Sequence, residues 1–160
     1  MTIEMADAMS SIHGITEGLP AAHADSRRLF CIAYALGAAL AVFAWQAATV
    51  YVNYGGNWTA FFVTGDVVPC PPELAARTYV FHGTAGYDGQ FYRYVAHAPW
   101  FRADWLPYFD SARLRYSRIL IPALAWTFAA GMQTRIDAAY IAVILGWVFL
   151  GVYWLGRLAV

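Results

Sequence analysis

A single apolar run near the N-terminus constrains this chain more than any other feature. Leu29 to Val52 gives 24 residues in which Gln46 and Thr49 are the only clearly polar side chains. As a helix rising ~1.5 Å per residue, the run extends about 36 Å, enough to cross a ~30 Å hydrocarbon core with some tilt. A cleaved signal peptide has a shorter apolar stretch of about 7–15 residues. The run therefore predicts a signal anchor that spans a membrane.

The composition agrees with a membrane protein. Hydrophobic residues make up 61% of the 160 residues and charged residues only 12%, about half the share usual in soluble domains. Ten arginines balance ten acids, and the absence of lysine excludes a Schiff-base lysine and a P-loop. A neutral chain is also unlike a nucleic-acid binder, so no nucleic-acid partner is expected.

The arginines that flank the run predict its orientation. Arg27 and Arg28 precede it, and no basic residue follows before Arg77. The positive-inside rule therefore places the N-terminus in the cytoplasm and the next segment outside. Residues 1–28 are polar and are interpreted as a disordered cytoplasmic tail. Cys31 and Cys70 then lie on opposite sides of the bilayer and cannot pair.

The rest of the chain divides by hydropathy. Residues 53–118 lack a spanning stretch but hold 16 of the 28 aromatic residues, which predicts an external loop with amphipathic helices in the membrane interface. Residues 119–132 are apolar but short, so they form either a short transmembrane helix or a re-entrant one. Residues 138–156 form a further span. The expected fold is an all-α membrane protein with about three transmembrane helices.

The C-terminal end of the sequence suggests that this chain is part of a larger protein or complex. The sequence stops three residues after Arg157, directly behind the last apolar run. We therefore expect the N-terminal part of a larger protein, or a subunit that joins another multi-span membrane protein.

The stretch from Gly86 to His97 is the most informative part of the loop. If it is helical from Gly89, aromatic and aliphatic side chains share one face, while Gln90, Arg93 and His97 share the other. Such a helix is expected to lie on the membrane surface with its aromatic face down.

Asp88 precedes that helix and has two interpretations. As an N-cap, its carboxylate would accept backbone N–H groups. As a general base, it would face a substrate, and glycines at Gly86 and Gly89 would let that substrate approach the backbone closely. The two interpretations are compatible.

Three arginines precede the second apolar run. Arg115 and Arg118 lie three residues apart and point to one side of a helix that Asp110 or Ser111 can cap, whereas Arg113 points elsewhere. Guanidinium groups bind phosphate bidentately, so the cluster fits a lipid-phosphate ligand. Contacts with anionic headgroups, or a different topology, would also explain it. No cofactor and no metal site are predicted.

Two motifs carry a resemblance to a known family. The segments Tyr87–Tyr92 and Arg115–Pro122 look like those of bacterial multi-pass membrane proteins that resemble the GT-C superfamily of integral membrane glycosyltransferases, mannosyltransferases in particular. The resemblance implies a bacterial inner (plasma) membrane location, with residues 53–118 external. It also implies a polyprenyl-phosphate-linked sugar donor and an acidic base in the first external loop. By position, Asp88 would be that base, and the substrate-binding residues would be Gln90, Tyr92, Arg113, Arg115 and Arg118.

Two functions therefore compete. The first is the N-terminal portion of a glycosyltransferase that moves a hexose from a lipid phosphate to an acceptor hydroxyl outside the membrane. The second is a non-catalytic membrane interaction or scaffold protein, or a truncated remnant. In that case a stripe of small residues on the first helix would bind a partner helix, although an alanine-rich composition also explains the stripe.

Overall fold

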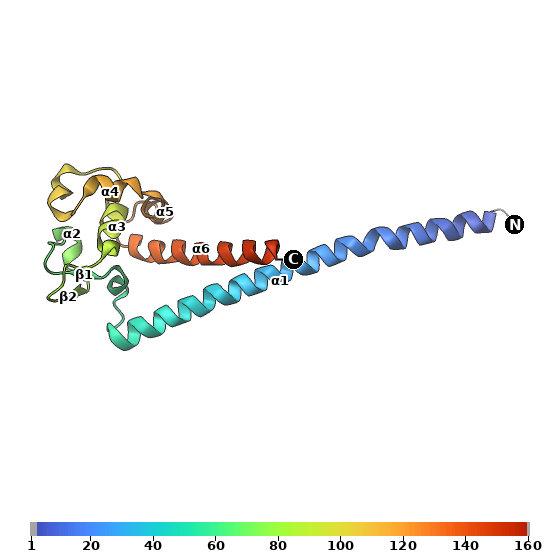
Figure 1. The fold of residues 1–160 in the computed structure, drawn as a ribbon, viewed down its shortest axis with the longest axis horizontal. Coiled ribbons are helices and arrows are strands. Elements are labelled where there is room, and N and C mark those ends of the chain that lie inside the picture. The colour runs from blue at the N-terminus through green and yellow to red at the C-terminus, as the bar shows by residue number, and fades with distance from the viewer. Residues whose placement is uncertain (1–2, 160) are drawn as a thin grey trace. The chain divides into compact units, whose positions relative to one another are not determined.

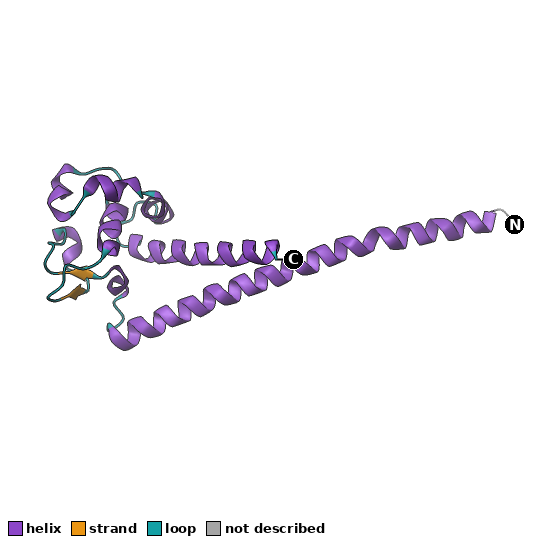
Figure 2. Cartoon of the chain, viewed as in Figure 1, coloured by secondary structure: helices purple, strands orange, loops and turns teal. Residues whose placement is uncertain are grey.

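The computed structural model describes residues 3–159, with side chains from residue 25 onward. The chain is mostly helical (Figures 1 and 2). Its elements in order are α1 (Ile3–Asn53), η1 (Trp58–Phe62), β1 (Thr64–Gly65), α2 (Pro72–Ala75), β2 (Val80–Phe81), α3 (Asp88–His97), η2 (Ala103–Tyr108), α4 (Ala112–Ser117), α5 (Leu120–Phe128) and α6 (Ile136–Leu158). They form two compact units: residues 41–147, and a second unit that contains the outer parts of α1 and α6.

Two helices of the described chain are long and apolar enough to cross a membrane. They are Asp25–Asn53 within α1, of 29 residues, and α6, of 23 residues. The run at 119–132, expected as a short transmembrane or re-entrant helix, forms α5 of only nine residues, about 14 Å long. Ala130 and Gly131 adopt positive φ angles directly after it, and this left-handed backbone ends the helix. The structure therefore has two candidate spans where the sequence predicted about three.

Helix α1 begins earlier than the apolar run. It starts at Ile3, so the backbone is helical through most of the segment expected to be a disordered tail, 1–28. Adding residues to an existing helix needs no new nucleus, and this favours continuation beyond the span. Residues 1–2 and the side chains of residues 3–24 lie outside the described part of the chain.

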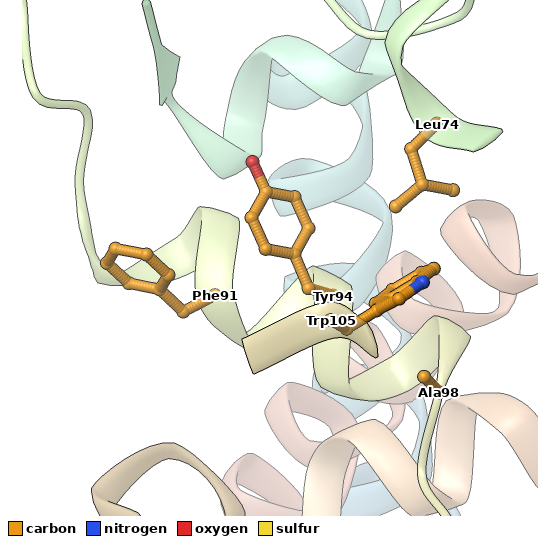
Figure 3. Packing of buried hydrophobic residues seen from close by; sticks show 5 residues of the cluster. All are labelled: Leu74, Phe91, Tyr94, Ala98 and Trp105. Atoms are coloured by element: carbon orange, nitrogen blue, oxygen red, sulfur yellow. The ribbon is translucent and has the colours of Figure 1, made fainter. Parts of the chain in front are cut away.

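The segment between the two candidate spans folds around α3. Its main hydrophobic core comprises Leu74, Phe91, Tyr94, Ala98 and Trp105. Figure 3 shows the Tyr94 ring of α3 between the Phe91 ring and the side chains of Leu74 and Trp105, which come from α2 and η2. A second cluster of small residues, Ala96, Ala125, Ala129 and Ile136, packs α5 and the start of α6 against α3.

The position of α3 corrects the expectation of a surface helix. Gln90, Arg93 and His97, which share its polar face, are as buried as the aromatic residues on the other face. Each of these polar side chains has hydrogen-bond partners inside the folded segment, and satisfied polar groups can be buried at little cost. Helix α3 is therefore the central helix of this segment rather than an amphipathic helix lying on a membrane.

The glycines around α3 have a structural reason. A Cβ atom at Gly86, where φ is +75°, would lie 2.6 Å from the amide nitrogen of Gly65 and from the carbonyl oxygen of Val63. One at Gly89 would lie 2.9 Å from the carbonyl oxygen of Phe62. The close approach that these glycines permit is thus made by the protein's own backbone, not by a substrate. Gly86 thus lets the loop before α3 lie against β1, which pairs in parallel with β2, and Gly89 lets the start of α3 lie against η1.

Candidate functional site

Asp88 is the first residue of α3, but it does not cap that helix. The N-cap residue is Tyr87, and no side chain caps the helix. The Oδ1 atom of Asp88 instead accepts a hydrogen bond of 2.8 Å from Nη2 of Arg115, 27 residues further along the chain. The N-cap interpretation is therefore wrong, although the carboxylate stays in the first turn, where the helix dipole favours a negative charge.

Arg115 is the buried centre of the site. It lies in α4, and only 4% of its surface is exposed. Its Nε and Nη2 atoms donate to the two carboxylate oxygens of Asp110 at 2.9 and 2.6 Å, which is the fork geometry that makes such pairs strong. The guanidinium also lies over the Phe91 ring, 4.7 Å from its centroid. One arginine thus binds two carboxylates and is held by α3.

The two carboxylates remain open to solvent. The side chains of Asp88 and Asp110 are 62% and 44% exposed, against 5% for Arg115. Hydrogen bonds from Arg115 lower the pKa of both carboxyl groups, and the two carboxylates raise the pKa of Arg115. Both acids are therefore ionised at neutral pH. The site presents anchored negative oxygens that can accept hydrogen bonds from a hydroxyl-bearing ligand.

Tyr92 connects this cluster to a second cation. Its hydroxyl oxygen accepts hydrogen bonds from Nη1 of Arg118 at 3.3 Å and from Nη1 of Arg115 at 3.5 Å. Arg118 is exposed and forms no ion pair with the residues whose side chains the structure describes. The structure brings four of the candidate residues into contact: Asp88, Tyr92, Arg115 and Arg118. Arg113 is exposed and makes no hydrogen bond or ion pair with them in the described part of the chain.

Gln90 lies apart from this cluster. Its side-chain Nε2 donates to the carbonyl oxygen of Ala85 at 2.7 Å, and its Oε1 accepts from the amide of Gly65 at 3.2 Å. The residue is almost fully buried. Gln90 therefore braces the loop before α3 and does not face a ligand.

A second charged cluster joins α3 to α6. Arg93 donates from Nε and Nη2 to both oxygens of Asp137 at 2.7 and 2.9 Å, and from Nη1 to the Thr78 hydroxyl at 2.7 Å. His97 contacts Asp137 through Nε2 at 2.9 Å and Gln133 through Nδ1 at 2.7 Å. The sequence analysis missed this cluster. The signals for it were Arg93 and His97 one turn apart, and one acid in the first turn of an apolar helix.

No metal site is apparent among the described residues. They contain no group of three histidine, cysteine or acidic side chains that could hold an ion. Cys31 and Cys70 are both free thiols.

The fold defines a mostly helical chain with two candidate membrane spans and a folded segment between them. Comparison with protein-family models, with curated proteins and with solved structures finds no match to this chain. The resemblance to GT-C glycosyltransferases therefore stays a hypothesis carried by the two motifs, and the function has to be argued from the site.

Proposed function

We propose that this chain inserts in a membrane through α1 and α6 and forms the N-terminal portion of a glycosyltransferase that uses a lipid-phosphate-linked sugar. The observation that carries the proposal is the site itself: an exposed, ionised Asp88 held by buried Arg115, with exposed Arg118 joined to the same cluster through Tyr92. A fixed carboxylate beside a second cation, which forms no direct ion pair with the described side chains, suits an acceptor hydroxyl on one side and a phosphate on the other.

The proposed reaction assigns one role to each group. Asp88 orients the acceptor hydroxyl and takes its proton as the acceptor oxygen bonds to the anomeric carbon. The bond from that carbon to the lipid-phosphate oxygen breaks, and its electron pair stays on the phosphate. Arg118 stabilises the growing phosphate charge. Arg115, whose donors already bind two carboxylates, is a positioning residue.

The low pKa of Asp88 is compatible with this role. A carboxylate held by Arg115 is a weak base towards a resting hydroxyl. When the acceptor oxygen bonds to an oxocarbenium-like carbon, however, its proton becomes strongly acidic, and a weak base then suffices. The ion pair fixes the carboxylate at the required angle and keeps it ionised.

The test compares Asp88→Asn with a matched variant, Asp104→Asn. Asp104 is equally exposed, at 63%, and also pairs with an arginine, Arg102, but it belongs to a different surface cluster. Membranes that carry the full-length protein would be supplied with polyprenyl-phosphate mannose or polyprenyl-phosphate glucose. We expect Asp88→Asn to lower sugar transfer at least about 100-fold, and Asp104→Asn to leave it near the wild-type rate. Wild-type transfer in Asp88→Asn would overturn the assignment.

One observation favours the non-catalytic alternative. The ion pair with Arg115 explains Asp88 completely as a structural residue. An interaction protein would then lose folded protein, not a separate activity, when Asp88 changes. The discriminating measurement is the amount of folded Asp88→Asn protein in the membrane. Normal folding of Asp88→Asn with loss of the transfer activity that the wild type shows supports the enzyme, whereas loss of folded Asp88→Asn protein, with no transfer activity in the wild type, supports the interaction protein.

A further inference from the structure

A groove lies between the outer parts of α1 and α6. Its volume is about 610 Å³, within the range of ligand pockets. The lining is apolar except for one cation and comprises Arg27, Phe30, Cys31, Tyr34, Val152, Leu155, Gly156 and Ala159. Cys31 and Gly156 form its narrowest part, where a Cβ atom on the glycine would lie 3.2 Å from the cysteine sulfur. The two small residues let the helices approach, and the large side chains around them form the walls.

The length of the groove indicates what fills it. On α1 the lining extends from Arg27 to Tyr34, which is about 10 Å along the helix axis. A further transmembrane helix would need a groove that follows the ~30 Å hydrocarbon core. This groove is confined to the end of the span that carries Arg27, so it matches the acyl chain of a lipid in one leaflet.

Arg27 supplies the polar end of such a site. Its side chain is exposed and forms no ion pair with the side chains of residues 25–159. A guanidinium binds a phosphate through two parallel hydrogen bonds. A second hollow of about 300 Å³ lies beside the first and shares Phe30 with it; its other lining residues are Ser26, Leu29 and Ala33. The two hollows meet at Phe30, and Arg27 lines the larger one, an arrangement that fits an anionic lipid with two chains.

We propose that this groove binds an anionic diacyl phospholipid, with the headgroup phosphate on Arg27 and the acyl chains on either side of Phe30. The inference rests on the proposed membrane insertion of α1 and α6, but not on the proposed transfer reaction. The bound lipid would stabilise the end of the helix pair that is furthest from the folded segment in sequence. Anionic headgroups next to the basic end of a span also agree with the positive-inside rule.

The experiment measures lipid retention on the full-length protein. The protein is first tested for membrane insertion by carbonate extraction. It is then reconstituted with an equal mixture of phosphatidylglycerol and phosphatidylcholine, extracted in mild detergent, and examined for bound lipid by native mass spectrometry. We expect one phosphatidylglycerol retained in preference to phosphatidylcholine, with saturation as its concentration increases. Release by carbonate would refute the membrane insertion itself, and the lipid site with it.

Two pairs of variants separate a specific site from general lipid contact. Arg27→Gln should lower phosphatidylglycerol retention at least about tenfold, whereas Arg28→Gln, which removes the neighbouring charge outside the groove, should retain it. Ala159→Phe fills the groove and should displace the lipid, while Ala142→Phe, on α6 away from the lining, should not. If an inserted protein retains both lipids equally, or if the Arg27 and Arg28 variants behave alike, the proposed site is wrong.

Discussion

Two arginine–carboxylate clusters in the same folded segment have the same chemistry but differ in how far they are exposed to solvent. In the first, Arg93 and Asp137 are both largely shielded from water, at 0% and 16% exposed side chain, and their remaining polar atoms bind Thr78 and His97. In the second, Arg115 is just as buried, but both of its carboxylates face solvent. One cluster is closed on every side, and the other is open on its acidic side.

The difference shows which cluster can meet a ligand. A closed pair has no vacant acceptor to offer, and its purpose is to fix α3 to the first turn of α6. An open pair keeps carboxylate oxygens available while the buried arginine fixes their positions. Burial of the arginine alone therefore does not distinguish a structural cluster from one that can bind a ligand. The exposure of its carboxylate partners makes that distinction. Breaking the closed pair should therefore change the free energy of unfolding by a different amount than breaking the open pair.

The largest effect is expected from Arg93→Met. Removing the guanidinium leaves Asp137 shielded from water without its bidentate partner, and loss of one member of a buried pair costs about 3–5 kcal/mol of unfolding free energy. Chemical denaturation of the purified protein in detergent would measure this. The double variant Arg93→Met with Asp137→Leu removes both charges and should recover much of the loss. A double variant as unstable as the single one would show that the unpaired charge is not the cause.

This cluster also shows what the sequence could not provide. The two candidate spans were predictable because hydropathy and length are properties of a continuous run of residues. The same is true of α3, expected from Gly89 and found from Asp88 to His97, ahead of Pro99. Its burial was not predictable. The polar face of a helix is expected to face solvent. Arg93 can instead be buried because Asp137, 44 residues further along the chain, pairs with it.

Only part of the candidate cluster was predictable from the sequence, and the contacts within it were not. The spacing of Arg115 and Arg118 placed them on one side of a helix, and both do reach the Tyr92 hydroxyl. That Arg115 binds Asp88 and Asp110, and so has its donors occupied, depends on how α4 packs on α3. The same packing places Gln90 against Gly65 and away from the site. Residue type and spacing suggest which residues belong to a site. Tertiary contacts determine which of their polar groups remain available to a ligand.

A smaller effect is expected from Arg115→Met, which breaks the open cluster. Both carboxylates already face water and stay hydrated, so the loss is limited to the charge-assisted hydrogen bonds of Arg115 and should be clearly smaller than that of Arg93→Met. The same denaturation measurement as for Arg93→Met gives the comparison directly. Arg115→Lys keeps the charge but loses the fork, and should lie between wild type and Arg115→Met. A loss as large as that of Arg93→Met would refute the distinction between open and closed clusters.

The smallest effect concerns acid pH. Because hydrogen bonds from Arg115 lower the pKa of Asp88 and of Asp110 in the folded protein, their contribution to stability is fully present above the unfolded carboxyl pKa of about 4. It is lost as the pH falls through the lowered folded values. Asp110→Asn removes one of these groups and should therefore reduce the slope of stability against pH below about pH 4, while leaving the curve flat above about pH 5.

The measurement is the thermal unfolding midpoint of wild type and Asp110→Asn between pH 3 and pH 8. The closed cluster stays intact in both proteins, so the difference between the two curves isolates the open one. Curves that remain parallel at acid pH would mean that Arg115 does not hold Asp110 in solution, and the anchored carboxylates of the candidate site would lose their support. A curve that flattens in the variant would show that the open cluster is formed and that its carboxylates stay ionised.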